Sequence, residues 1–350
     1  MKRWDGNRNV LKADRLSDFC RHVSAMCGAG IPIAKAMEIM QISAENKKLN
    51  RLYRELQSQM EQGYSFSYAM EKTGAFPELL LHMFRAAEIA GNLEETAKRM
   101  EGYYRKEHRM RNQIRTATLY PKILGIVSVF VVLTVFFVVV PTVEPLFEGV
   151  KLPLLTRILI LCSKGLAEAW YLVLIALLIL SMVFSAAMKN ERVRIFWDRL
   201  KVKVPFIRKQ FRIIYTARFA RSESGLYGSG IPMVESLEIA ARTIGNRYIE
   251  AQFSDVIGKI QGGYAFSRAI EEVDGFHPGL APVIFVGEET GMLDEMLTDL
   301  AEGYEHDAEI AVNRLVAMVE PAMILGMGLV IGLILLGIMM PMWSMYEYMV

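Results

Sequence analysis

The sequence has few cysteines and lacks the short motifs with which many enzymes bind nucleotides or metals. Three cysteines occur among its 350 residues, and no two of them form a CxxC pair. A disulfide framework and a zinc site are therefore not expected. The motifs GxxxxGK(S/T), HExxH and GxSxG are also absent, which disfavours a P-loop nucleotide site, a zinc protease and a serine hydrolase. We expect no catalytic residues and no cofactor.

Asp, Glu, Lys and Arg are missing from three long stretches of the chain. Each stretch reaches the roughly 20 residues that a helix needs to cross the hydrocarbon of a bilayer. Apolar residues make up 53% of the chain, a proportion that favours a membrane protein over a soluble domain. We predict transmembrane helices over residues 119–141, 169–188 and 318–343. Glycines in the third stretch would allow close approach of another helix, and the alternative is a role in flexibility within the bilayer; they are Gly326, Gly328, Gly332 and Gly337.

Lys and Arg flank these stretches unevenly. They are dense before the first stretch and after the second, whereas the loop between the two has few of them. Basic residues near the ends of a span tend to stay on the cytoplasmic side. We therefore expect a multi-pass protein of the cytoplasmic (inner) membrane, and no cleavable secretory signal in its polar first 22 residues. The segments expected inside are 1–118 and 189–317, and those expected outside are 142–168 and 344–350.

A 200-residue internal repeat runs through the chain. The stretch AGIPIAKAMEI (29–39) returns as SGIPMVESLEI (229–239), and GYSFSYAM (63–70) returns as GYAFSRAI (263–270). AEIAGNLEE (87–95) likewise returns as GEETGMLDE (287–295). Matches at one fixed spacing indicate an internal duplication. Each copy ends in one apolar stretch, and the second predicted span lies between the copies.

The repeated residues are mainly those that begin and end helices. Glycine suits the left-handed position after a helix, proline suits the first turn, and serine suits the N-cap. The residues assigned to these roles are Gly30, Pro32, Gly63, Ser67 and Gly91 in the first copy, and Gly230, Pro232, Gly263, Ser267 and Gly291 in the second. Apolar residues between them recur at helical spacing. We predict an all-α membrane protein with two homologous cytoplasmic helical bundles, 1–118 and 189–317 (the latter including a basic linker), plus three transmembrane helices.

A small group of carboxylates in the repeated loops is a candidate metal site. Glu88, Glu288 and Glu289 lie beside a predicted helix break, and carboxylates are the ligands that a hard cation such as calcium prefers. The alternative is that these side chains accept backbone hydrogen bonds at a helix end. Both interpretations stay open at the level of sequence.

Charge differs between the two copies at equivalent positions. The helix that leads into the first span is basic, whereas the helix that leads into the third is acidic and contains Asp299, Glu302 and Glu305. These three residues are candidates for docking on a basic partner, either the other copy or a second protein. The alternative is a solvated helix face that diverged without function. The basic run 189–221 follows a span directly, which favours membrane lipids over direct contact with nucleic acid.

With these motifs, the sequence resembles the type II secretion F-protein family. The doubled GIP and FSxA motifs and the stretch GEETGMLDEMLTDLAEGYE carry this resemblance, which extends from about Phe19 to Pro341. It implies an inner-membrane platform protein of a type IV pilus, a competence pseudopilus or a type II secretion machine. The partners it implies are a hexameric assembly ATPase, pilin or pseudopilin subunits, other inner-membrane assembly proteins and further copies of the chain. A transporter or channel is the alternative, and a membrane enzyme such as a protease is a third possibility.

Overall fold

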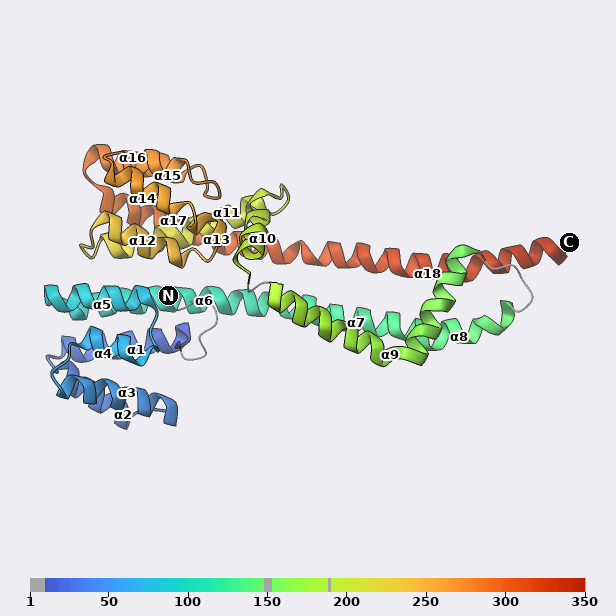
Figure 1. The fold of residues 1–350 in the computed structure, drawn as a ribbon, viewed down its shortest axis with the longest axis horizontal. Helices are drawn as coiled ribbons and strands as arrows, with labels where there is room; N and C mark the ends of the chain where they lie inside the picture. Colours follow the sequence, from blue (N-terminus) through green and yellow to red (C-terminus); the bar gives the residue numbers. More distant parts are fainter. Residues whose placement is uncertain (1–9, 148–152, 188–189, 350) are drawn as a thin grey trace. The chain divides into compact units, whose positions relative to one another are not determined.

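The computed structural model describes residues 10–147, 153–187 and 190–349, and every regular element in these ranges is a helix (Figure 1). The all-α fold predicted from the sequence is confirmed. The chain divides into two compact units. Unit 1 contains residues 1–113 and 195–312, and unit 2 contains residues 114–194 and 313–350.

Unit 1 holds two bundles built from the same succession of helices, as the repeat predicts. We call α1–α6 the repeat 1 bundle and α11–α17 the repeat 2 bundle. Repeat 1 consists of α1 (Ala13–Gly28), α2 (Ile33–Ile42), α3 (Lys47–Glu61), α4 (Phe66–Thr73), α5 (Glu78–Ala90) and α6 (Leu93–Ala117). After α10 (Glu191–Lys203), repeat 2 consists of α11 (Arg208–Tyr227), α12 (Met233–Thr243), α13 (Arg247–Glu250), α14 (Phe253–Gln261), α15 (Phe266–Glu271), α16 (Leu280–Thr290) and α17 (Leu293–Ala317). The pair α13 and α14 together replace α3.

The repeated glycines end helices in the left-handed conformation. Gly30 has φ +75° and Gly230 has φ +80°, and Gly91 and Gly291 end α5 and α16 with φ +73° and +71°. A side chain with a Cβ is strained at such a φ, whereas glycine is not. These positions therefore fix the turns between the helices in both bundles.

The predicted N-caps at Ser67 and Ser267 are wrong by two residues. The N-cap of α4 is Ser65, whose side chain accepts a hydrogen bond from the backbone N–H of Tyr68. Ala265 occupies the N-cap of α15 and has no oxygen to offer. Ser67 and Ser267 lie inside the first turn instead. Two serines two positions apart both suit a cap, and the spacing alone did not separate them.

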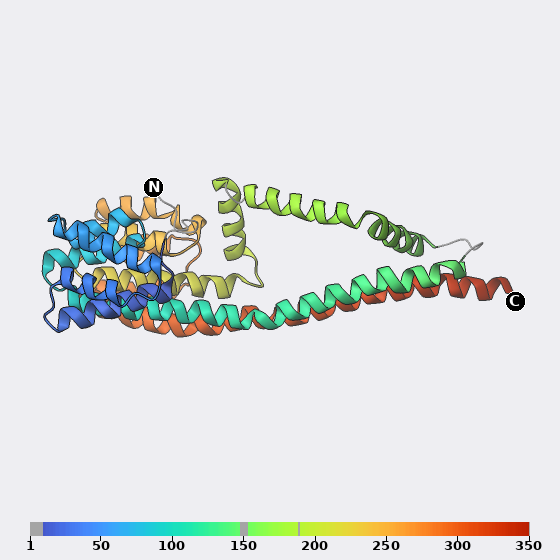
Figure 2. The same ribbon diagram turned by 90° about the horizontal axis from the view of Figure 1, so that it is seen from below.

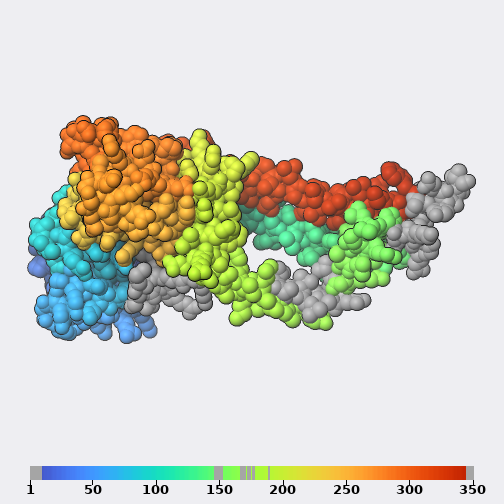
Figure 3. Space-filling view, turned by 45° about the horizontal axis from the view of Figure 1, so that its top comes forward, coloured from blue at the N-terminus to red at the C-terminus, as the bar shows by residue number. Residues whose placement is uncertain are grey.

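Each bundle is built around an aromatic pair at equivalent positions. Phe19 is fully buried, with its ring centroid 4.9 Å from that of Phe76. In repeat 2 the corresponding rings of Phe219 and Phe276 are 5.0 Å apart. The buried side chains of the two bundles form one continuous cluster, and Figure 3 shows the surfaces of repeat 1 (blue to cyan) and repeat 2 (yellow to orange) adjoining. Burying one phenylalanine contributes roughly 1.5–3 kcal/mol, so this shared cluster is a main source of stability for unit 1.

Unit 2 holds the apolar helices, among which α7 and α18 run side by side (Figure 2). The helical stretches Leu93–Val143 and Leu293–Trp343 are long and apolar enough to cross a membrane, in agreement with the first and third predicted spans. The elements of unit 2 are α7 (Leu119–Thr134), a π-helical turn η1 (Val135–Val139), α8 (Val140–Val143), a 3₁₀ turn η2 (Glu144–Phe147), α9 (Leu154–Ala187) and α18 (Val319–Met349).

The second predicted span, 169–188, falls on α9 and partly outside the described residues. The helix itself begins at Leu154, within the segment predicted as an extracytoplasmic loop. The boundary differs because charged residues such as Lys164 limit a hydrocarbon-spanning segment but do not end a helix. Only one of the four glycines of α18 closely approaches another helix. A Cβ at Gly337 would meet the side chain of Leu159 in α9, whereas Gly326, Gly328 and Gly332 have open space around them.

Prolines in α8 and α18 each leave a backbone carbonyl without its helical donor. In α18, Pro341 has no N–H to give to the carbonyl of Gly337 four residues earlier; the hydroxyl of Thr156 donates to that oxygen at 2.6 Å. In the π-helical turn, the donor five residues on from Phe136 is Pro141, and the hydroxyl of Ser163 donates to the Phe136 carbonyl at 2.7 Å. The N-terminal part of α9 therefore supplies one hydroxyl to each of the two carbonyls that the equivalent prolines leave without a donor.

This pairing makes a specific prediction for Ser163→Ala. Removing the hydroxyl orphans the Phe136 carbonyl and should lower the unfolding free energy of the detergent-solubilised chain by about 1–2 kcal/mol. Adding Pro141→Ala returns a backbone N–H to that carbonyl, so the double variant should recover most of the loss. Titration with a denaturing detergent measures both effects.

The matched control is Pro341→Ala, which supplies a donor to Gly337 and not to Phe136. It should fail to rescue Ser163→Ala and should rescue Thr156→Val. Equal rescue by either proline substitution would contradict the assignment of one hydroxyl to each gap.

Candidate functional site

The two predicted metal-ligand candidates at equivalent positions each anchor a helix. Glu88 accepts hydrogen bonds from the backbone N–H groups of Phe66 (2.6 Å) and Ser67 (3.1 Å), and the Ser67 hydroxyl donates to it at 2.6 Å. Glu288 accepts from the backbone N–H groups of Phe266 (2.6 Å) and Ser267 (3.0 Å). A carboxylate at a helix N-terminus satisfies donors that have no partner within the helix. Of the two arrangements that the sequence left open, Glu88 and Glu288 therefore adopt the one in which a carboxylate accepts backbone hydrogen bonds at a helix end.

Glu289 differs from the other two candidates, because its side chain is exposed. It borders a hollow of about 410 Å³ that also includes Tyr264, Arg268 and Phe285. The guanidinium of Arg268 places a positive charge in this hollow, which opposes cation binding. Within the described ranges, no group of three or more His, Cys, Asp and Glu side chains is arranged to hold a metal ion.

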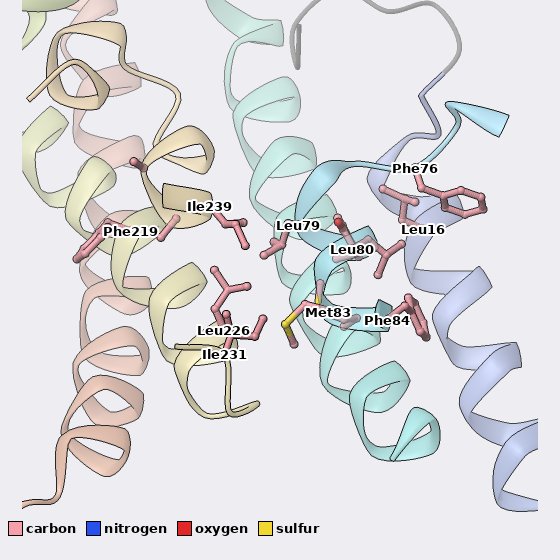
Figure 4. Close-up of a cluster of buried hydrophobic side chains, with 14 of the residues drawn as sticks. Leu16, Phe76, Leu79, Leu80, Met83, Phe84, Phe219, Leu226, Ile231 and Ile239 are labelled. Atoms are coloured by element: carbon pink, nitrogen blue, oxygen red, sulfur yellow. The ribbon is translucent and has the colours of Figure 1, made fainter. Parts of the chain in front are cut away.

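The two bundles meet through an apolar contact between α5 and α12. Figure 4 shows Leu79 and Met83 of α5 directed toward Ile239, Leu226 and Ile231 of repeat 2. All five side chains belong to the shared buried cluster. At the rim of this contact, two exposed pairs join the helices: Arg242 with Glu78 at 2.7 Å, and Glu235 with His82 at 3.5 Å.

Beside the apolar contact lies a cluster of charges drawn from both repeats, of which all but the exposed Lys106 have little access to solvent. Arg221 of α11 is 8% exposed, and its Nε donates to a carboxylate oxygen of Glu305 on α17. Its Nη1 lies 3.8 Å from Glu107 of α6. Lys106, also on α6, reaches Glu305 at 2.7 Å. We call Lys106, Glu107, Arg221 and Glu305 the inter-repeat charge cluster; it holds α6 of repeat 1 against α11 and α17 of repeat 2.

The electrostatics of this cluster favour the charged forms. Burial alone would raise the pKa of the Glu107 carboxyl, but the positive charges of Arg218, Arg111 and Arg221 outweigh it and lower that pKa below its usual value. Arg111 also donates to Glu107 at 2.7 Å. Because removing one member of a buried ion pair strands the other, such clusters are sensitive to single substitutions.

One of the three docking residues predicted from the sequence takes part in this interface. Glu305 contacts Lys106 of the other copy, which is one of the two partners considered. Asp299 and Glu302 are exposed, and neither forms an ion pair within the part of the chain that the structure describes. Sequence reasoning missed Arg221 and Glu107. A comparison of the copies gives no signal for them, because Arg221 returns as Arg21 and Glu107 as Asp307, with the same charges at equivalent positions.

Glu223 is a second buried carboxyl, close in sequence to the charge cluster. The residue is fully buried, and its Oε1 accepts a hydrogen bond from the Ser236 hydroxyl at 2.6 Å. Its Oε2 has no hydrogen-bond partner among the described residues. Burial raises the pKa of Glu223 to about 8, against the lowering effect of the Ser236 hydrogen bond. The carboxyl is therefore protonated at neutral pH.

In unit 2, α7 and α18 enclose an apolar groove of about 350 Å³. Val129, Val132 and Met323 are among its lining residues, and Gly326 forms part of its floor. Large apolar side chains are exposed along the described parts of α7, α9 and α18. Such surfaces are suited to hydrocarbon chains or to another apolar helix.

The fold defines a helical membrane protein built from a duplicated bundle and span, and comparison with known proteins identifies its family. The sequence profile of type II secretion system (T2SS), protein F matches twice, over residues 19–141 and 219–341. The chain belongs to this family. The two matches are offset by 200 residues, which confirms the internal duplication inferred from the sequence.

Individual relatives cover nearly the whole chain. The type IV pilus assembly protein PilC of Thermus thermophilus is 32% identical over 94% of this chain and 82% of its own length. PilC of Myxococcus xanthus is 29% identical over 93% of this chain and 79% of its own length. The type II secretion system protein F of Aeromonas hydrophila is 30% identical, covering 96% of this chain and 89% of that protein. The chain is thus similar to proteins of both pilus assembly and secretion.

The charge cluster predicts unequal costs for two arginine substitutions at the same interface. Arg221→Met should lower the unfolding free energy by about 3–5 kcal/mol, because it leaves buried carboxylates without their shared cation. Arg242→Met removes an exposed ion pair and should cost no more than about 1 kcal/mol. Chemical unfolding of the full chain in detergent measures both, and equal losses would contradict the burial argument.

Glu223 predicts a pH-dependent term in stability. The folded chain keeps a proton that the unfolded chain releases above its ordinary pKa of 4.5. Stability should therefore fall as pH rises from about 5 to 8, by up to about 1.4 kcal/mol per pH unit from this group. Glu223→Gln removes that term, so the stability of the variant relative to the unsubstituted chain should increase with pH.

Unfolding curves at pH 5, 6, 7 and 8 test this difference. The unsubstituted chain, measured at the same four pH values, is the reference. A constant difference for Glu223→Gln would show that the carboxyl is already ionised at pH 5.

Proposed function

We propose that this chain is a non-catalytic assembly platform in the inner membrane of a type IV pilus, competence pseudopilus or type II secretion machine. It couples a hexameric cytoplasmic ATPase to the polymerisation of pilin or pseudopilin subunits. Membership of the protein F family and the names of the relatives, type IV pilus assembly protein and type II secretion system protein, support this role.

The observation that carries the proposal is the pairing of one rigid double bundle with apolar helices. The double bundle shares a single buried core, so a force applied to one repeat is transmitted to the other through Leu79, Met83 and Arg221. Each repeat leads into an apolar helical stretch. The sequence contains no P-loop with which to hydrolyse nucleotide, so the energy comes from a partner.

The proposed topology follows the distribution of basic residues. The N-terminal region and both bundles lie in the cytoplasm, three helices cross the membrane, and the C-terminus lies outside. The bundles then face the ATPase, and the exposed apolar side chains face pilin helices and lipid. The basic segment 189–221 lies at the cytoplasmic surface, where anionic lipids attract Lys and Arg.

Deletion of the gene tests the proposal. We expect pilin to be processed normally and to remain in the inner membrane, with shed filaments or secreted substrate reduced at least tenfold. Immunoblots of sheared filaments and of membranes measure this. Complementation with the full chain should restore assembly, and normal filaments in the deletion strain would contradict the role.

A further inference from the structure

The contact between the two repeats is not reciprocal. Repeat 1 contributes α5 and repeat 2 contributes α12. Their equivalents are α16 in repeat 2 and α2 in repeat 1. Figure 1 shows α5 and α12 facing each other at the centre of unit 1, with α16 and α2 at its opposite outer edges. Within the chain, the contact surfaces of α5 and α12 therefore cover each other, whereas the equivalent surfaces of α16 and α2 do not pack against the other repeat.

The exposed surface of α2 carries apolar side chains at positions whose equivalents in α12 lie at the contact with α5. Ile239 of α12 is 6% exposed, whereas the equivalent Ile39 of α2 is 36% exposed. Ile42, at the position of Arg242, is 80% exposed. Ile39 and Ile42 are three residues apart on one helix, so they present neighbouring apolar side chains, and burying them against a partner would be favourable.

The open surfaces have changed together at the positions that form rim pairs inside the chain. The ion pair Glu78–Arg242 is replaced by Pro278 and Ile42, so two charges have become two apolar groups. The pair His82–Glu235 is replaced by Pro282 and Lys35. We call Lys35, Ile39 and Ile42 the α2 face, and Pro278, Pro282 and Val286 the α16 face. All six side chains are exposed.

The charges beside these faces are also complementary. The buried contact of Arg221 with Glu107 has as its equivalents Arg21 and Asp307. Arg221 is 8% exposed, whereas Arg21 is 59% exposed and pairs only with its neighbour Asp18 among the described residues. Asp307 is exposed. The pair Lys106–Glu305 has no such counterpart, because its equivalents are His306 and Arg105.

We propose that the α2 face of one copy docks on the α16 face of a second copy, in the way that α12 docks on α5 within the chain. The apolar rim positions meet each other, and Arg21 of one copy meets Asp307 of the next. Because the two surfaces differ, the contact is head-to-tail and builds a ring or a row rather than an isolated two-fold dimer. The inference deepens the proposed platform function, on which it rests for the side of the membrane, by naming the two faces through which copies of the chain meet.

Cross-linking in membranes tests the contact with two differently tagged copies of the full chain. Both lack the native cysteines; one carries Lys35→Cys and the other Pro282→Cys, the equivalents of Glu235 and His82, which lie 3.5 Å apart. A short bismaleimide should join the two tags in one product. Cells that make only one of the two variants should give little product, because a head-to-tail contact does not bring identical positions together.

A second experiment introduces the equivalent of the Arg242–Glu78 ion pair at the proposed contact between two copies. Ile42→Arg on the Lys35→Cys copy should reduce the mixed product about tenfold, since it leaves an arginine against Pro278. Adding Pro278→Glu to the other copy recreates the Arg242–Glu78 pair and should restore the product to within about twofold. Ile42 is exposed, so unchanged thermal unfolding of Ile42→Arg confirms that folding is intact.

The outcomes separate this inference from the proposed function. Absence of mixed product in cells that assemble filaments normally would overturn the contact and leave the platform role standing. Equally strong product from either variant alone would show a two-fold contact and would also overturn it. Mixed product that Ile42→Arg does not change would show that these faces do not carry the association.

Discussion

A buried arginine shared by two repeats is the interaction on which unit 1 depends. Arg221 has little access to water, so its charge requires counter-charges, and they come from Glu107 of repeat 1 and Glu305 of repeat 2. Separation of the bundles would break the two ion pairs that cross between the repeats, Arg221 with Glu107 and Lys106 with Glu305, at a cost in free energy, while Arg221 and Glu305 would stay paired within repeat 2. The apolar contact of Leu79 and Met83 with repeat 2 adds to this cost. The two bundles therefore behave as one mechanical body, which is the property that a coupling platform needs.

Duplication followed by divergence explains how one motif came to supply different surfaces. The equivalent glutamates Glu88 and Glu288 keep the same backbone hydrogen bonds, so the local architecture is unchanged. At the contacts, however, Arg221 and Arg21 differ in burial, and Arg242 and Ile42 differ in chemistry. Identical bundles would have identical faces and no defined order. Divergence at the rim makes the equivalent faces chemically different, and such differences allow one contact to be favoured over another.

Local features of the sequence predicted the fold well, because glycines with positive φ and apolar residues at helical spacing act within a few residues. The helix ends at Gly30 and Gly91 are of this kind. The N-cap of α4 was predicted at Ser67 instead of Ser65. The hydroxyl of Ser67 donates to Glu88, a residue 21 positions away that a local pattern does not reveal. The predicted span 169–188 covers only part of α9, which begins at Leu154, because hydropathy identifies residues suited to lipid and not the ends of a helix.

The candidate site was harder to predict, because its partners are far apart in the chain. The acidic composition of α17 drew attention to Glu305 but also to Asp299 and Glu302, which have the same charge and differ only in burial. Arg221 lies 84 residues before Glu305, and no periodicity links the two. The carboxylates Glu88 and Glu288 suited either a cation or backbone donors, and only the positions of the Phe66 and Phe266 N–H groups distinguish these arrangements.

The most direct test of the single double bundle is a cross-link across its centre in native membranes. Leu79→Cys and Ile239→Cys, introduced together in a chain without native cysteines, should be joined by a short bismaleimide within one chain. A protease site between the repeats would then leave the two halves covalently linked after cleavage. If the halves separate while both cysteines react with a water-soluble maleimide, the repeats do not share a core and the account is wrong.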